Sequence, residues 1–135
     1  LPAIADDSGI CVDILGGSPG IFSARWSGPA RSAGENVDLL LWQLSDNDEL
    51  HRGGEFVCAA ALALPNGGED VRVGTWRGHV LGERAGSGGF GYDPIFKPDD
   101  TDVSAAELTQ AQKDRLSHRA KAFTELAGVI AQLSD

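Results

Sequence analysis

The sequence has no methionine, few basic residues and no long hydrophobic run. The scarcity of basic residues and the lack of a long hydrophobic run limit the partners that the protein can bind. Eleven Lys and Arg stand against twenty Asp and Glu, which gives a formal net charge of −9. Nucleic acids and membrane surfaces are polyanions, so this charge argues against either as a general partner. A small anionic ligand is still compatible with it, because a divalent cation can bridge carboxylates to phosphate.

The sequence also contains no signal for membrane insertion, secretion or zinc binding. The longest apolar run, Cys58 to Pro65, is far too short to cross a bilayer. No basic segment followed by a long apolar one occurs near Leu1, so we find no signal peptide and expect a cytoplasmic protein. Cys11 and Cys58 each sit among apolar residues, without a second cysteine nearby. We interpret both as buried reduced thiols.

The size and composition suit one globular unit. The 135 residues are 41% hydrophobic and 23% charged, so we expect a single domain over residues 1–135. A complete gene product begins with methionine, whereas this sequence begins with Leu-Pro-Ala-Ile, which is typical of the entry to a strand. We therefore expect a piece of a longer chain that lacks its beginning.

Hydrophobic periodicity and turn residues predict alternating strands and helices. The expected elements are strands over 3–5 and 10–15, a helical turn over 21–26, a helix over 33–45, strands over 56–64 and 71–81, a turn over 104–108, and helices over 109–116 and 117–133. Ser8-Gly9 is expected to turn the chain between the first two strands. Asn66-Gly67-Gly68 predicts a hairpin, and Ser117 is a candidate N-cap.

The segment Ser87–Pro94 reads Ser-Gly-Gly-Phe-Gly-Tyr-Asp-Pro, and it combines backbone freedom with aromatic and acidic side chains. A core strand would not contain so many glycines, and a solvated linker would not carry both Phe90 and Tyr92. One interpretation is a shaped loop that presents an aromatic face and the Asp93 carboxylate to a flat ligand. The alternative is a glycine-rich hairpin whose aromatic side chains cover the core.

Two further segments carry polar chemistry. Asp6 and Asp7 stand where a strand is expected to end, so one carboxylate could bind a metal such as Mg²⁺ or activate water. The alternative is a turn capped by Asp and Ser8. His118 and Arg119 fall in the first turn of the last helix, where cations oppose the helix dipole, so they are candidate donors to a ligand. The alternative is a solvated helix start.

Other nucleotide and hydrolase signatures are missing. The glycines at 86–91 lack the Lys-Ser/Thr pair of a phosphate-binding Walker loop. Ser8 and His118 would be a conceivable hydrolase pair, but no nucleophile-elbow pattern surrounds Ser8. Metal-assisted hydrolysis fits these residues better.

Several long stretches together resemble the inosine-triphosphate pyrophosphatase family, in the order of that family and over nearly the whole chain. They are Leu-Pro-Ala-Ile-Ala-Asp-Asp-Ser-Gly from Leu1, Gly-Gly-Ser-Pro-Gly-Ile-Phe-Ser-Ala-Arg-Trp from Gly16, Gly-Ser-Gly-Gly-Phe-Gly-Tyr-Asp-Pro-Ile-Phe from Gly86, Thr-Asp-Val-Ser-Ala-Ala-Glu-Leu from Thr101, and Ser-His-Arg-Ala-Lys-Ala from Ser117. The resemblance implies an elongated α/β fold, with a mixed sheet, helices in two lobes and the substrate cleft between them. It also implies a homodimer that hydrolyses ITP, dITP and XTP to monophosphate and pyrophosphate with Mg²⁺, and so cleans the nucleotide pool.

The resemblance also assigns roles to particular residues. Asp7 matches the general base and a metal-site carboxylate, and Asp6 is its partner in the acidic pair. The matched substrate-contacting positions are Ser8, Phe90, Gly91, Tyr92, Asp93, Lys113, His118 and Arg119. Phe90 would stack on the base, and the last three would recognise its polar groups. Donors facing a 6-keto oxygen would favour hypoxanthine and xanthine over adenine, whose 6-amino group is itself a donor.

The sequence also departs from the family pattern. Ala120 stands where the family usually has glycine. The family opens with a strand and a Ser/Thr-x-Asn-x-x-Lys loop that grips the triphosphate, followed by a metal-binding Glu and a Lys. The match places all of these before Leu1. The absent phosphate loop leaves a truncated, non-catalytic fragment as one alternative, and a septum-formation-type nucleotide pyrophosphatase of related fold is another.

Overall fold

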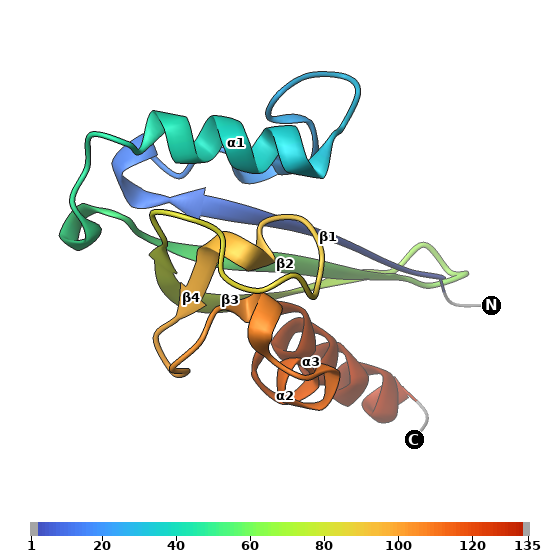
Figure 1. Cartoon of the computed structure of the whole chain (residues 1–135). Coiled ribbons are helices and arrows are strands. Elements are labelled where there is room, and N and C mark those ends of the chain that lie inside the picture. Colours follow the sequence, from blue (N-terminus) through green and yellow to red (C-terminus); the bar gives the residue numbers. More distant parts are fainter. Residues whose placement is uncertain (1–2, 134–135) are drawn as a thin grey trace.

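Four antiparallel strands form one sheet in the order β1-β2-β3-β4. The computed structural model describes residues 3–133, so Leu1 and Pro2 of the expected strand entry lie outside them. The strands are β1 (Ala3–Val12), β2 (Gly53–Ala63), β3 (Glu69–Val80) and β4 (Phe96–Pro98). Figure 1 shows α1 next to β1, and α2 with α3 on the other side of the picture next to β2 and β3. The expected α/β class with flanking helices is confirmed, and within residues 3–133 the sheet is antiparallel and not mixed.

The three α-helices begin and end close to the expected residues, whereas residues 13–15, expected at the end of a strand, form a 3-10 helix instead. The α-helices are α1 (Ala33–Gln43), α2 (Gln110–Leu116) and α3 (His118–Leu133). Short 3-10 helices are η1 (Asp13–Leu15), η2 (Gly20–Arg25), η3 (Glu49–His51), η4 (Asp93–Ile95) and η5 (Ala105–Glu107). The Ser117 hydroxyl accepts a hydrogen bond from the Ala120 amide at 3.1 Å, which confirms the predicted cap of α3.

β1 is one continuous strand, so the expected turn at Ser8-Gly9 is wrong. Both residues pair with β2 without interruption. A Cβ at Gly9 would collide with the carbonyl oxygen of Gly20, so this glycine lets η2 lie against the strand instead of turning the chain. Asp6 and Asp7 were expected at the end of a strand, but they lie within β1.

One face of the sheet carries the hydrophobic core. The larger cluster includes Ile10, Val12, Val37, Leu40, Leu44, Phe56, Trp76, Val80, Tyr92, Ile95, Phe96 and Ala105. The smaller cluster consists of Cys58, Ala60, Leu62, Ala122 and Leu126, and joins β2 to α3. Of the two free cysteines, Cys58 is buried as predicted, whereas Cys11 is only half-buried.

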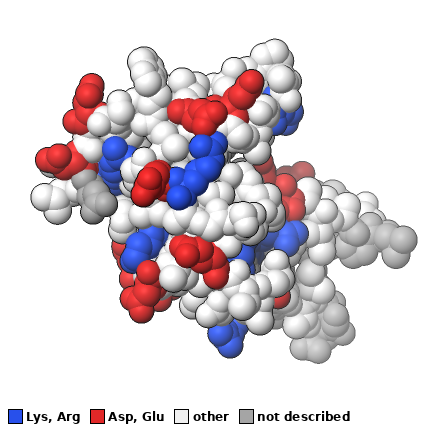
Figure 2. Space-filling model, viewed as in Figure 1, with Lys and Arg blue, Asp and Glu red and all other residues white. Residues whose placement is uncertain are grey.

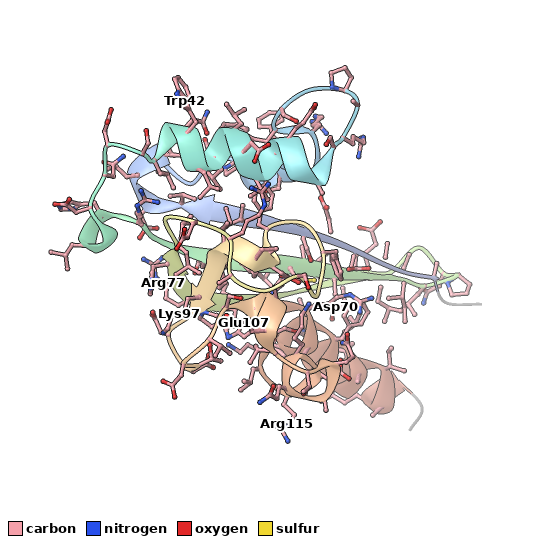
Figure 3. The ribbon with its side chains drawn as sticks, viewed as in Figure 1. Trp42, Asp70, Arg77, Lys97, Glu107 and Arg115 are labelled. Atoms are coloured by element: carbon pink, nitrogen blue, oxygen red, sulfur yellow. The ribbon has the colours of Figure 1, made fainter. Side chains whose placement is uncertain are left out.

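The opposite face of the sheet is largely open. Along β2 and β3 buried residues alternate with half-buried or exposed ones. Val71 and Val73 point to the open face and are 56% and 54% exposed. On α1 the apolar residues turn toward the core, but Trp42 points away from it and is 73% exposed (Figure 3).

Charges on the surface are mixed. Figure 2 shows acidic and basic side chains interspersed on the face in view, without a broad basic area. Arg77 forms an ion pair with Asp13, and Arg84 pairs with Asp38 at 2.8 Å. Within residues 3–133, no helix is long and apolar enough to span a membrane.

Candidate functional site

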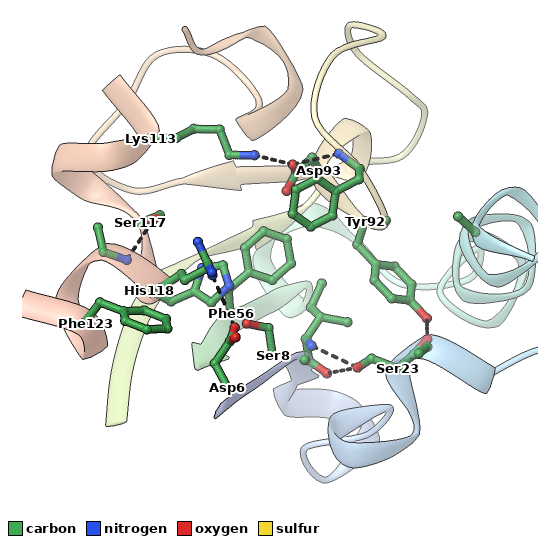
Figure 4. Close-up of a pocket in the computed structure, with 18 of the residues that line it drawn as sticks. Asp6, Ser8, Ser23, Phe56, Tyr92, Asp93, Lys113, Ser117, His118 and Phe123 are labelled. Carbon is green, nitrogen blue, oxygen red and sulfur yellow. Dashed lines mark hydrogen bonds and ion pairs between the residues drawn. The ribbon is translucent and has the colours of Figure 1, made fainter. Parts of the chain in front are cut away.

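A cavity of about 710 Å³ brings together segments that are far apart in the sequence. Its walls come from β1, η2, the start of α1, the glycine-rich loop, α2 and α3 (Figure 4). The predicted site residues that line it are Asp6, Ser8, Phe90, Gly91, Tyr92, Asp93, Lys113, His118 and Arg119. Asp7 does not line it. The structure therefore places all but one of the candidate residues around one space.

The two aromatic side chains of the glycine-rich loop have different surroundings. Phe90 is 78% exposed and faces the cavity, whereas Tyr92 is only 7% exposed. The Tyr92 hydroxyl donates a 2.7 Å hydrogen bond to the carbonyl oxygen of Ser23. Burial raises the pKa of Tyr92 to about 12, so this donor keeps its proton. Tyr92 thus anchors the loop to η2, while Phe90 is free to stack on a ligand.

A buried ion pair fixes the loop on its other side. Lys113 Nζ lies 2.7 Å from Asp93 Oδ2, and both side chains are largely buried. The same carboxylate oxygen accepts a 3.1 Å hydrogen bond from the Phe90 amide. Lys113 Nζ also lies 4.9 Å from the Phe90 ring centroid. The pair therefore holds the backbone and the ring of Phe90 in place, and Asp93 balances the Lys113 charge.

His118 offers a neutral imidazole to the cavity. Burial lowers its pKa from the ordinary 6.5 to about 4, against the opposing charge of Asp93. Its ring lies 4.9 Å from the Phe56 ring centroid, and its Nδ1 is buried without a hydrogen-bond partner within residues 3–133. A neutral imidazole does not conflict with the helix dipole. At neutral pH it supplies one donor and one acceptor.

Arg119 reaches from α3 across to β1. Its Nε lies 3.2 Å from Asp6 Oδ2, and its guanidinium carbon lies 4.7 Å from the Phe123 ring centroid. The Arg119 side chain is 59% exposed, so this ion pair is solvated and easily exchanged for a ligand oxygen. Arg119 is therefore able to present its planar donor fork to a bound molecule.

The acidic pair does not form a metal site with its described neighbours. Neighbouring residues of a strand point to opposite faces, which places Asp6 toward the cavity and Asp7 away from it. Among residues 3–133, no group of three His, Cys, Asp or Glu side chains could hold a metal ion. Asp6 is moreover already paired with Arg119. The described residues thus do not fit the expected Mg²⁺ without further ligands.

The cavity also contains residues that the sequence analysis missed. Ser23 accepts a 2.9 Å hydrogen bond from the Ile10 amide and ties η2 to β1. The Asn36 side chain accepts from Ser27 and donates to the Ala24 carbonyl, which holds η2 against α1. These contacts join segments nine or more residues apart and leave no periodic signal in the sequence.

Comparison with known proteins settles the family. The Ham1 family model matches residues 1–129. The chain belongs to the Ham1 family. It is 56% identical over 133 residues to a dITP/XTP pyrophosphatase of Streptomyces avermitilis, and 50% identical over 135 residues to one of Nocardia farcinica. The alignments cover 98% and 100% of this chain, so the family prediction is confirmed.

Solved structures of Ham1 proteins have the same fold. The Staphylococcus aureus Ham1 protein superposes with a TM-score of 0.91 at 37% identity, covering 97% of this chain and 67% of that chain. A dITP/XTP pyrophosphatase from Mycobacterium abscessus gives a TM-score of 0.80 at 49% identity, covering 93% and 64%. The chain spans about 66% of the length of the curated Ham1 relatives that it matches.

Proposed function

We propose that this chain acts in the hydrolysis of non-standard purine nucleoside triphosphates, and that its cavity binds the base. The proposed reaction converts ITP, dITP or XTP to the monophosphate and pyrophosphate and so cleans the nucleotide pool. The observation that carries this proposal is an exposed aromatic ring, Phe90, beside the donors of His118 and Arg119 in one cavity. The names of the Streptomyces and Nocardia relatives support the same substrate class.

Selectivity for the base follows from the hydrogen-bonding character of these donors. The 6-keto oxygen of hypoxanthine or xanthine accepts hydrogen bonds, whereas the 6-amino group of adenine donates them. Arg119 only donates, so an amino group facing it would leave both groups unpaired. Phe90 offers a flat surface to either base, so stacking contributes to affinity but not to this discrimination.

For the hydrolytic step we propose Asp7 as the proton acceptor. A water oxygen forms a bond to phosphorus, the bond to the pyrophosphate leaving group breaks, and the Asp7 carboxylate takes the water proton. Because Asp7 lies outside the cavity on exposed β1, this role requires a phosphate chain that extends from the base site past β1. The proposed Mg²⁺ would need ligands beyond those described, and none of these steps depends on it.

Equilibrium binding tests the base site directly. We expect the chain to bind inosine about tenfold more tightly than adenosine by calorimetry, because leaving donors of the site unpaired against the 6-amino group costs roughly 1.4 kcal/mol. Arg119→Ala should lower the inosine/adenosine ratio, while Arg84→Ala, a charge-matched change outside the cavity, should leave it unchanged. Equal binding of the two nucleosides by the unaltered chain would refute the base site.

Pyrophosphate release from dITP tests the catalytic proposal. Loss of a general base costs on the order of 10²–10⁴ in rate, so we expect Asp7→Asn to reduce any turnover by that factor. Asp46→Asn serves as the charge-matched control, since Asp46 is exposed and does not line the cavity. If Asp7→Asn retained turnover, Asp7 would not be the proton acceptor.

A second candidate function is nucleoside binding without turnover. The position of Asp7 outside the cavity favours this hypothesis, together with the lack of a metal cluster among residues 3–133. A chain that binds inosine selectively but releases no pyrophosphate would fit it. Both candidate functions therefore predict selective inosine binding, and only hydrolysis predicts the release of pyrophosphate from dITP.

We further propose that the chain works as one domain in a cytoplasmic homodimer. Support for self-association comes from the open sheet face, where Val71 and Val73 are more than half exposed. The mixed surface charges of Figure 2 and the net charge of −9 support a partner other than nucleic acid.

A further inference from the structure

The cations of the cavity differ in whether a carboxylate already balances them. Lys113 pairs with Asp93 at 2.7 Å, and Arg119 pairs with Asp6 at 3.2 Å. Arg31 also lines the cavity, but its guanidinium makes no ion pair or hydrogen bond within residues 3–133. Arg31 is therefore the cavity cation that no carboxylate within residues 3–133 balances, so its charge is available to an incoming anion without breaking an ion pair.

Arg31 sits on the opposite side of the cavity from the base-recognising helices. It lies between η2 and α1, whereas Lys113 and Arg119 belong to α2 and α3. Its backbone has a φ of 55°, the left-handed region that favours glycine. Among residues 3–133, Arg31 is the one non-glycine residue with a positive φ. The strained backbone thus carries a long charged side chain at the cavity margin, where a glycine would be more stable.

The acidic groups of the cavity also give a bound nucleotide a direction. Asp114 lines the α2 side, accepts a 2.9 Å hydrogen bond from Gln110 and forms no ion pair within residues 3–133. Phosphate oxygens placed there would meet a like charge, whereas on the α1 side they would meet the free guanidinium of Arg31. The arrangement favours a base near α2 and α3 and phosphates near Arg31.

We propose that Arg31 binds phosphate oxygens of the nucleotide whose base occupies the cavity, an inference that rests on the proposed function. A guanidinium presents several donors in a plane, which suits two oxygens of a phosphate at once. The role is one of substrate binding and orientation, and it does not include proton transfer. Arg31 accordingly contributes to the affinity for phosphate and not to the recognition of the base.

Calorimetry with two separate probes tests this role on the 135-residue chain. Inorganic triphosphate reports on the Arg31 side and inosine on the base side. We expect Arg31→Ala to weaken triphosphate binding about tenfold and to leave inosine binding unchanged, while Arg31→Lys retains part of the affinity. Arg115→Ala is the charge-matched control, since Arg115 lies outside the cavity and points away from α2 (Figure 3).

The outcomes separate this inference from the function on which it rests. The inference is overturned if the unaltered chain fails to bind triphosphate, if Arg31→Ala binds it equally well, or if Arg115→Ala loses as much affinity. The inference is also overturned if Arg31→Ala weakens inosine binding as much as triphosphate binding. Arg31→Gly removes the same side chain but relieves the backbone strain, so it shows whether such a loss of binding comes from misfolding. If the unaltered chain failed to bind inosine, the base site would be refuted. The effect of Arg31→Ala on triphosphate binding would still decide whether Arg31 binds phosphate.

Discussion

Polar side chains of the cavity keep or lose their charge according to their burial and their partners. Lys113 is largely buried but faces a carboxylate, and Arg119 is more than half exposed. His118 is buried against aromatic rings and has Lys113, Arg119 and Lys121 nearby, so its neutral form is favoured despite Asp93. A neutral imidazole next to paired cations lets the site offer donors without accumulating positive charge.

This environment of His118 predicts a pH-dependent stability. The unfolded chain binds a proton at this histidine below pH 6.5, whereas the folded chain does so only below about pH 4. The free energy of unfolding should therefore fall as the pH drops from 6.5 to 4, by about 3 kcal/mol from this group. Urea unfolding of the chain across this range measures the effect.

Two variants identify the group responsible. His118→Phe keeps a ring between Phe56 and Trp76 but cannot titrate, so its stability should change less between pH 6.5 and 4. His51→Gln removes an exposed histidine and should behave like the unaltered chain. An unchanged pH dependence in His118→Phe would contradict the assignment.

At the scale of the elements, close backbone approach positions the site. α3 packs on β2 and β3 at Gly74, where a Cβ would collide with the His118 carbonyl oxygen and the Ala122 amide. Gly9 has the same function between β1 and η2. Both glycines lie within strands, where they weaken local propensity but allow a helix to approach. This approach brings the start of α3 to the cavity.

A pair of glycine substitutions tests this packing. Gly74→Ala should destabilise the chain by about 3 kcal/mol, because the added methyl group meets helix backbone that cannot rotate away. Gly128→Ala, at an exposed position of α3 and with nothing near its Cβ, should stabilise it by about 1 kcal/mol. Denaturant unfolding compares the two, and similar effects of both changes would refute the packing argument.

The whole molecule has one well-packed sheet face and one open face. Side chains of β2 and β3 that point to the open face include Val71 and Val73, both more than half exposed. Exposed apolar area of this kind promotes association, and β1 lies at one end of the strand order. The shape of the molecule therefore favours contact with another protein surface at this face.

A charge placed on the open face should oppose self-association. We expect the chain to associate with increasing concentration in sedimentation velocity, and we expect Val73→Lys to shift it toward the monomer, since a buried lysine is costly. Trp42→Lys is the control, because Trp42 is 73% exposed on α1 and points away from the core (Figure 3). If both variants associated like the unaltered chain, this face would not be the contact surface.

Local pattern by itself determined most of the elements and the family. The three α-helices, the β2–β3 hairpin and the Ser117 cap were predicted, because periodicity and capping act over a few residues. The long ordered stretches around the Asp-Asp pair, the glycine-rich loop and the Ser-His-Arg segment indicated the family. These features depend on neighbours in the sequence, and so they can be read from it.

Only the tertiary structure decided how these segments face one another. It showed that Gly9 lets η2 lie against β1 and does not turn the chain, and that Asp6 faces the cavity whereas Asp7 does not. It also showed that Tyr92 anchors the glycine-rich loop, while Phe90 of the same loop stays exposed to the cavity. The same holds for the free charge of Arg31. Side-chain direction within a strand, burial and ion pairing depend on contacts between distant segments, and a local sequence pattern contains no record of them.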